Sequence, residues 1–492
     1  MKLLNQHIQS FAVAFILCLS VFSVSAQQSN SLYYMTVIPQ SNQLNPATQP
    51  RCTFYLGMPG FSSVEINAGN TSEAFDDILK YDAKLDSLVW FLHDQQMQDN
   101  FLSKLRKLNS AYAETRIDLI SFGFRVKKTY LSFLIGDRAE ARTSIPYDLA
   151  RLAIRMNQNS IGTNATETFD LSGMGVKSTY YREFSVGASH QFSDKLTVGL
   201  RAKLLFGIAN VNTNTSNVGF QNTGYQQWTL RSLTEINTSV PHLKTKLKPD
   251  GTIDSVKFES IENGHEARSI LMSTQNKGLA LDMGVIYKPM EKLSLSASVL
   301  DFGYIKWKNN TQNFTQDASY DFKGVNLNLS DTADVGNDLL DTLKSRFTFK
   351  KNTNSYTTSL STKIYLGAEY DLVKWFGVGF LTRLQFIDKR VDPQYTLSLN
   401  MHPGNVFNFT LSYTVADKVY SNLGAGLSLK LGPLQWYLIS DRIPLYYKPV
   451  ANKGYAIPPY AKNVNIRTGM NLVFGYNHNS KKANKDKPLV EP

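Results

Sequence analysis

The chain has 492 residues, of which 42% are hydrophobic and 12% aromatic, and its formal net charge is +12. This composition excludes a helical membrane protein, which would be far more apolar, but it suits a barrel that exposes only alternate residues to lipid. A large soluble β protein fits the same composition. The positive charge shows no basic cluster with interleaved aromatics, so no nucleic-acid partner is predicted.

Residues 1–26 predict a secretory signal peptide. Lys2 precedes an apolar run over residues 11–22, and Val24-Ser25-Ala26 fits a small-residue cleavage site. Removal of this segment would leave Cys52 as the only cysteine, so internal disulfides are excluded. No later apolar run approaches the ~20 residues of a membrane helix. The exported chain is therefore predicted to be either soluble or a barrel.

Residues 27–49 are polar and rich in turn formers, and they predict a plug or hatch in the lumen rather than a strand of the wall. Pro39 and Pro46 cannot donate to a strand ladder. Asn45, Pro46 and Ala47 form the turn motif of this segment. The wall is predicted over residues 50–476, starting with a short hairpin of residues 52–58 and 61–67 around Pro59-Gly60.

Helical spacing of apolar residues predicts short helical inserts near residues 71–109 and 146–156. Two interpretations of the first insert stay open. It is either a cap over one end of the barrel or a plug within it.

The clearest hairpin spans residues 183–207. Phe184, Val186 and Ala188 share one parity, and Glu183 and Ser185 share the other. The second arm alternates in the same way after a short polar turn at residues 193–195. Side chains alternate across a strand, and each arm has the ~10 residues that a tilted transmembrane strand needs. The pattern predicts a transmembrane antiparallel β-barrel.

The remaining strands repeat this pattern, and their connections alternate between short and long. Short periplasmic turns and long external loops are typical of outer-membrane barrels. Residues 210–277 and 309–359 are predicted to be long polar excursions, with one strand at residues 229–240. Residues 477–492 are predicted to be a disordered polar tail. The other predicted arms are residues 115–125 and 129–137, 279–287 and 293–299, 362–370 and 376–386, 395–401 and 406–414, 423–431 and 434–440, and 464–474.

Several charged or polar residues fall on the parity that faces away from lipid. They either line a permeation path or are the polar groups that any water-filled barrel needs. These predicted lumen residues are Arg201, Lys203, Asp282, Arg383 and Gln385.

No catalytic or cofactor motif is found. The seven histidines are scattered, and neither a GxSxG motif, a P-loop nor a CxxC pair occurs. The acidic loop residues Asp250, Asp254 and Glu259 lack the spacing of a calcium loop. The sequence therefore predicts no enzyme, no cofactor and no metal.

Four segments resemble one uncharacterised family of outer-membrane barrels of Bacteroidota. They are Asn45-Pro46-Ala47 after an export signal, residues 196–207, residues 300–303 leading to Trp307, and the closing residues 465–475. That family is similar to FadL-type transporters of hydrophobic compounds and to PorV-type barrels of type IX secretion. The chain departs from many such barrels because a 17-residue tail, residues 476–492, follows its last strand.

The resemblance implies a monomeric barrel of about fourteen strands in the cell outer membrane, with a luminal hatch around Asn45-Pro46-Ala47. Two functions are predicted, one from the export signal, the hatch and the alternating strands, and the other from the long polar excursions at residues 210–277 and 309–359. The first is a channel for uptake or export of hydrophobic small molecules. The alternative is a structural or docking barrel that anchors a secretion or cell-surface complex. The expected partners are outer-membrane lipid, hydrophobic small molecules, and a protein at the cell surface or in the periplasm.

Overall fold

The computed structural model describes residues 30–71, 75–82, 85, 87–157, 167–224, 227–322, 348–387, 390–404, 406–416, 419–443, 448–449, 456–457 and 462–475. The predicted signal peptide (residues 1–26) and the predicted tail (residues 477–492) lie outside these residues. Among the described helices, none has the length and hydropathy to cross a membrane.

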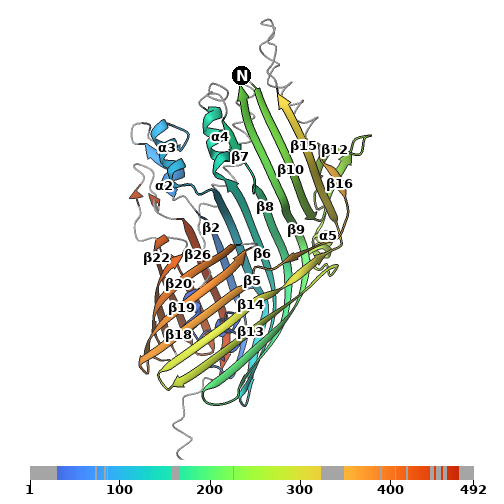
Figure 1. Ribbon diagram of the computed structural model, residues 1–492. Coiled ribbons are helices and arrows are strands. Elements are labelled where there is room, and N and C mark those ends of the chain that lie inside the picture. The colour runs from blue at the N-terminus through green and yellow to red at the C-terminus, as the bar shows by residue number, and fades with distance from the viewer. Residues whose placement is uncertain are drawn as a thin grey trace, which may run out of the picture.

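In the described residues, antiparallel strands close a 14-stranded barrel, so the predicted fold class is confirmed (Figure 1). β1 (Phe54–Gly57) and β2 (Ser63–Asn70) share the first position, and β26 (Asn463–Phe474) pairs with both to close the ring. Between them, in order around the wall, lie β5 (Leu108–Val126), β6 (Thr129–Pro146), β8 (Gly175–Gln191), β9 (Leu196–Gly224), β13 (Asn276–Met290), β14 (Leu293–Trp307), β18 (Lys363–Val373), β19 (Phe376–Ile387), β20 (Arg390–Met401), β21 (Phe407–Ala416), β22 (Val419–Leu431) and β23 (Leu434–Ser440).

The alternation on β13 shows how the sequence sets the two faces of the wall. Leu279 is 56% exposed and Tyr287 is 46% exposed on the outer face. Between them, Ala280 and Asp282 are buried on the inner face. Lys277 ends the apolar run on the outer face. A run of this length covers the apolar band of ~25 Å that such barrels present to lipid.

The hairpin predicted over residues 52–58 and 61–67 is wrong. β1 and β2 both pair with β5 on one side and with β26 on the other, so they are two halves of one interrupted wall strand. Gly60 has a φ of 72°, and the chain loops outward there so that Phe61 is 68% exposed. Ser62 then returns to the interior and is fully buried. A hairpin and an interrupted strand show the same alternation of side chains around a Pro-Gly pair. Only the strands with which the two segments pair distinguish these arrangements.

One side of the wall is much taller than the other (Figure 1). β9 runs for 29 residues, and its upper part pairs with β10 (Gln227–Ser239), which pairs with β15 (Thr311–Phe322). The strand predicted at residues 229–240 corresponds to β10, but the loop predicted over the rest of residues 210–277 and 309–359 is wrong for β15 and for the upper part of β9. The reason is that a sheet beyond the membrane meets water on both faces and needs no apolar alternation.

The helical inserts follow β2 and β6 and lie beyond the upper ends of these strands (Figure 1). The first contains α2 (Phe75–Ile78) and α3 (Gln95–Lys104), with the small hairpin of β3 (Leu79–Asp82) and β4 (Ser87–Trp90) between them. The second is α4 (Tyr147–Asn157). Their position favours the cap over the plug. The remaining elements are η1 (Asn30–Tyr34), η2 (Pro39–Gln43), β7 (Thr168–Asp170), β11 (Leu243–Leu247), β12 (Ile253–Phe258), α5 (Gly264–Leu271), β16 (Lys350–Asn352), β17 (Tyr356–Ser359), β24 (Lys448–Pro449) and β25 (Ala456–Ile457).

Replacing Leu200 by arginine is expected to destabilise the barrel by roughly 2–4 kcal/mol, because Leu200 is 52% exposed within the apolar band. The measurement is urea unfolding of the protein in phospholipid vesicles. Leu233→Arg is the matched control, since Leu233 is 46% exposed on β10, above the band. Its expected change is within about 0.5 kcal/mol. Equal losses for the two variants would show that the apolar band is placed incorrectly along the wall.

Candidate functional site

A buried segment fills the lumen between the wall strands. Residues 30–50, which we call the hatch, form η1 and η2 and the turns around them, and nearly all of their side chains are buried. Hatch residues bond to opposite sides of the wall. Tyr34 Oη donates to the carbonyl oxygen of Phe380 on β19 (2.7 Å), and Gln43 Nε2 donates to Asp118 on β5 (2.6 Å). The lumen is therefore occupied across its width.

The Asn45-Pro46-Ala47 turn rests on a pair of glycines in the wall. Asn45 Oδ1 accepts a bond from the Ala47 backbone N–H (2.9 Å), which fixes the turn. Gly199 on β9 and Gly284 on β13 are direct cross-strand partners. A Cβ atom on Gly199 would lie 2.2 Å from the Pro46 carbonyl, and one on Gly284 would lie 2.1 Å from Asn45 Oδ1. The turn motif fits only where both wall residues lack a side chain.

One side of the hatch is apolar and lies against an apolar part of the wall. The Tyr33 and Tyr365 rings stack with centroids 5.6 Å apart. Burial raises the pKa of the Tyr33 phenol, which stays protonated and donates to Ser296 (3.0 Å). Gly379 makes room for the Tyr34 ring, because a Cβ there would lie 2.6 Å from it. The cluster comprises hatch residues Leu32, Tyr33, Tyr34, Met35, Val37, Ile38 and Leu44 and wall residues Leu300, Tyr365, Leu381, Tyr437 and Ile439.

The other side of the hatch is polar and meets the charged part of the wall. The backbone oxygen of Asn42 accepts a bond from Arg201 Nη2 (2.9 Å). Gln40 and Asn471 exchange two amide bonds of 2.8 and 2.9 Å. The apolar side of the hatch therefore faces the apolar part of the lumen wall, and its polar side faces the charged part.

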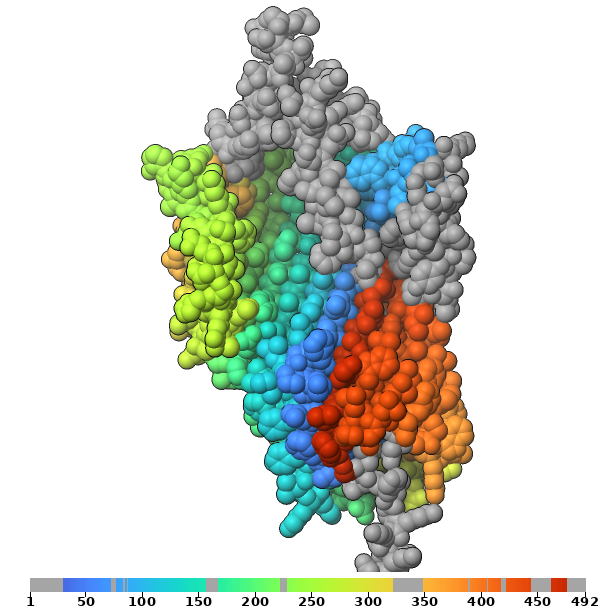
Figure 2. Space-filling model, turned by 180° about the vertical axis from the view of Figure 1, so that it is seen from behind, coloured from blue at the N-terminus to red at the C-terminus, as the bar shows by residue number. Residues whose placement is uncertain are grey.

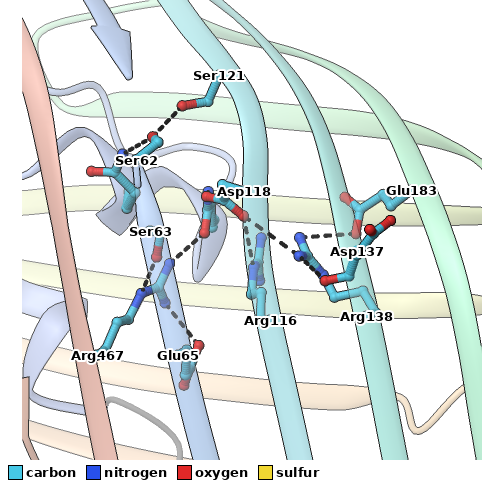
Figure 3. Close-up of polar contacts among 12 residues, drawn as sticks. Ser62, Ser63, Glu65, Arg116, Asp118, Ser121, Asp137, Arg138, Glu183 and Arg467 are labelled. Atoms are coloured by element: carbon cyan, nitrogen blue, oxygen red, sulfur yellow. Dashed lines mark hydrogen bonds and ion pairs between the residues drawn. The ribbon is translucent and has the colours of Figure 1, made fainter. Parts of the chain in front are cut away.

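A chain of buried ion pairs runs around the charged part of the lumen, and Figure 3 shows its first half. Arg467 pairs with Glu65 (3.3 Å), and hatch residue Gln43 links Arg467 to Asp118. Arg138 lies between Asp118 (3.5 Å) and Glu183 (3.2 Å). The chain continues through Lys203, which contacts Glu183 (4.0 Å), Asp282 (2.8 Å) and Asp301 (2.6 Å), and ends with Lys363 on Asp301 (3.3 Å).

All five predicted lumen residues are buried, but they do not form one group. Arg201, Lys203 and Asp282 lie together, because both cations contact the Asp282 carboxylate. Arg383 donates to Gln385 two places along β19. Among the described residues, neither of these two joins the ion-pair chain.

Asp301 joins the ion-pair chain although its sequence position gave no signal. It has a φ of 58°, and the pairing of β13 with β14 shifts register there. The bulge turns the side chain inward beside the inward-facing Leu300, and the Asp301 backbone N–H donates to Asp282 (2.8 Å). Glu183 and Arg467 could have been predicted as lumen residues, because both alternate with apolar residues in predicted strands.

The ion-pair chain borders a small cavity of about 50 Å³ above the hatch, lined by Leu44, Arg116, Lys203, Asp301 and Lys363 among others. Its charged walls suit water or a small polar group. Within the described residues, no group of three or more His, Cys, Asp and Glu side chains could hold a metal ion.

Solved structures that match the chain include proteins from three bacteria. The toluene transporter TbuX of Ralstonia pickettii is 10% identical, with 89% of this chain and 94% of that chain covered and a TM-score of 0.39. The toluene transporter TodX of Pseudomonas putida is 8% identical, with 92% and 93% covered and a TM-score of 0.35. The translocator domain of the autotransporter NalP of Neisseria meningitidis is 9% identical, with 92% and 99% covered and a TM-score of 0.32.

No curated protein matches the sequence. One family model does, over residues 46–441, and its description is "Family of unknown function (DUF5723)". The match begins at Pro46 in the hatch turn and ends at Asp441 just after β23, so it covers most of the wall. The chain therefore belongs to the DUF5723 family.

Proposed function

We propose that the protein is an outer-membrane channel for hydrophobic small molecules that is closed at rest by its hatch. The observation that carries the proposal is the apolar seat in the lumen wall. Tyr365, Leu381 and Tyr437 are fully or almost fully buried there, and hatch side chains cover them. A lumen that only had to hold water would not need such a surface.

The recesses of the apolar seat are formed by wall residues and not by the hatch. Gly367, Gly379 and Gly426 are wall residues, and each leaves space that Tyr33, Tyr34 or Met35 of the hatch occupies. Displacement of the hatch would leave recesses of aromatic size between apolar side chains. A small apolar molecule could replace the hatch side chains in those recesses, because burial of its surface is favourable at about 25 cal/mol per Å².

Deleting residues 27–49 is expected to give a folded barrel that passes an apolar dye faster than the complete chain does. The removed segment bonds to the inside of the wall, whereas the wall closes through β26 and the β1/β2 position without it. The measurement is uptake of the dye into vesicles that contain an albumin trap, with heat-modifiable gel mobility as the folding check.

Vesicles without protein are the control for the dye measurement. Equal uptake with the complete chain, with the deletion variant and without protein contradicts the channel. A deletion that abolishes membrane assembly would show instead that residues 27–49 belong to the wall.

The tall side of the barrel favours a second candidate, a docking barrel that anchors a partner at the cell surface. The upper part of β9, together with β10 and β15, extends the sheet far beyond the apolar band. Transport of a small molecule gives no reason for such an extension. Crosslinking on intact cells from positions on β10 tests this candidate, and recovery of the uncrosslinked protein alone contradicts it.

A further inference from the structure

Residues 240–275, which contain β11, β12 and α5 and which we call the external lobe, pack against the outside of the barrel at the edge of the apolar band. Arg182 lies on the outer face of β8, where it pairs with Asp137 (2.7 Å) and donates to Met272 Sδ (3.3 Å). The next outward residue along β8 is the apolar Phe184. Figure 2 shows the lobe in light green, standing out at one side of the molecule. The lobe therefore lies at the level where lipid headgroups would surround the wall.

The external lobe presents large apolar side chains to its surroundings. Phe258 is 71% exposed, Ile261 is 53% exposed and Met272 is 59% exposed. α5 is amphipathic, and Asn263 caps its N-terminus by accepting a bond from the Glu266 N–H (2.9 Å). In water these side chains would be an aggregation hazard, whereas in the headgroup region of a bilayer they would be buried.

A cleft of about 610 Å³ lies between the external lobe and the wall, and hydroxyl and amide side chains line much of it. Ser269 and Ser273 contribute from the helical part of the lobe. Two amides from the wall side are held by the backbone. Asn276 Oδ1 accepts bonds from Lys308 and Asn309 N–H (both 2.9 Å), and Gln312 Nε2 donates to the Leu243 carbonyl. Asn276 also donates to Gly207 and Ser239, and Gln312 also accepts from Thr245, so these two amides fix the wall of the cleft. Other lining hydroxyls and amides, those of Ser273, Asn310 and Thr353, suit a hydroxyl-rich ligand. The volume lies in the range of about 300–1,000 Å³ that small-molecule sites occupy.

The cleft is also lined by a lysine, Lys351, whose ammonium has no carboxylate partner among the described residues. Lys244 pairs with Glu259 (3.7 Å) and His242 contacts Glu266 (3.4 Å). Lys351 lines the cleft half-buried and makes no ion pair with any described residue. Two lining residues, His242 and Asn310, have φ values of 61° and 55°, a strained conformation that clusters at ligand sites.

We propose that this cleft binds the anionic sugar headgroup of a glycolipid in the outer leaflet. The amides and hydroxyls match sugar hydroxyls, Lys351 matches a phosphate or carboxylate on the sugar, and the apolar rim matches the acyl chains below. The assignment rests on the outer-membrane location proposed above, but it does not depend on transport through the lumen.

The test measures how much phosphorylated lipooligosaccharide stays with the full-length protein after detergent extraction from vesicles of this lipid and phosphatidylethanolamine. Lys351→Gln is expected to lower retention roughly tenfold, since a charge-assisted bond is lost. Ser269→Trp, which fills the cleft, is expected to abolish retention. Lys350→Gln is the matched control, because Lys350 is the exposed neighbour of Lys351 outside the cleft. Heat-modifiable mobility checks folding, and Lys351→Gln alone carries the test where Ser269→Trp fails to fold.

Equal retention by the wild type, Lys351→Gln and Lys350→Gln overturns the proposal. A second measurement uses soluble glucosamine 6-phosphate to separate the two sources of the headgroup. Binding of the free phosphosugar without retention of the lipooligosaccharide also overturns the lipid site. Dye uptake is measured in vesicles of phospholipid alone, so a failure of the channel and a failure of this cleft are distinguishable.

Discussion

Replacing Lys203 by methionine is expected to lower the free energy of unfolding by about 3–5 kcal/mol. Lys203 is 6% exposed, and its ammonium is shared by Asp282 (2.8 Å) and Asp301 (2.6 Å), with Glu183 farther away (4.0 Å). Removal of one member of a buried ion pair costs this much because the remaining charges stay buried without compensation. Urea unfolding in vesicles measures the loss.

A second substitution separates the electrostatic cause from lost packing. Adding Asp301→Asn to Lys203→Met is expected to recover part of the loss, because it removes one of the buried negative charges that Lys203 balanced. The recovery is partial because Lys363 then loses its contact with Asp301. Lys306→Met on the exposed outer face of β14 is the control and should change stability by less than about 0.5 kcal/mol. If Lys203→Met behaved like Lys306→Met, the ion-pair chain would have no role in holding the barrel together.

Replacing Gly199 by valine is expected to displace the hatch without unfolding the wall. The added Cβ would lie 2.2 Å from the carbonyl carbon and oxygen of Pro46, and these backbone atoms cannot rotate away as a side chain would. Overpacking of this kind costs about 1–3 kcal/mol, which shifts the equilibrium toward the displaced hatch by about fivefold to 150-fold. Faster dye uptake and faster thiol labelling of Cys52 should follow together.

Cys52 follows the hatch by two residues, so its exposure should report on the position of the hatch. It is fully buried in a cluster with Tyr55 and Tyr130. Burial raises the pKa of the thiol to about 12, so the seated form should react slowly. Gly219→Val, on the same strand, is the matched control, since a Cβ at Gly219 meets nothing within 4 Å. Equal labelling of the two variants would show that the glycine pair does not position the hatch.

The wall was predictable from the sequence because lipid and lumen impose a period of two on every strand within the membrane. The exposed Leu281 and the buried Asp282 show this period in neighbouring positions of β13. The same rule placed Arg201 and Lys203 on the inner face. It could not place Asp301, whose left-handed backbone changes parity within β14. A bulge depends on how two strands pair, and pairing is not visible in one strand.

The hatch seat could not be predicted for a different reason. Gly199 and Gly284 are 85 positions apart, and only the β9–β13 register makes them a pair. The turn motif at Asn45 was predicted from the sequence, but nothing in the motif indicates which wall strands it contacts. Of the tall strands, β10 was predicted, but β15 and the upper part of β9 were not, because no lipid imposes an apolar alternation on them.

The position of the hatch next to β1 restricts how the hatch can move once the barrel has closed. Phe54 pairs with Phe474, so the joint between the first and last strands brings together the most distant parts of the wall and must wait for the rest of the chain. Once this joint is made, the hatch is surrounded on all sides by hydrogen-bonded wall. After closure, residues 30–50 can move only through an open end of the barrel, and their covalent link to β1 keeps them tethered there. The hatch is therefore a tethered plug that can leave its seat and return while the wall stays closed.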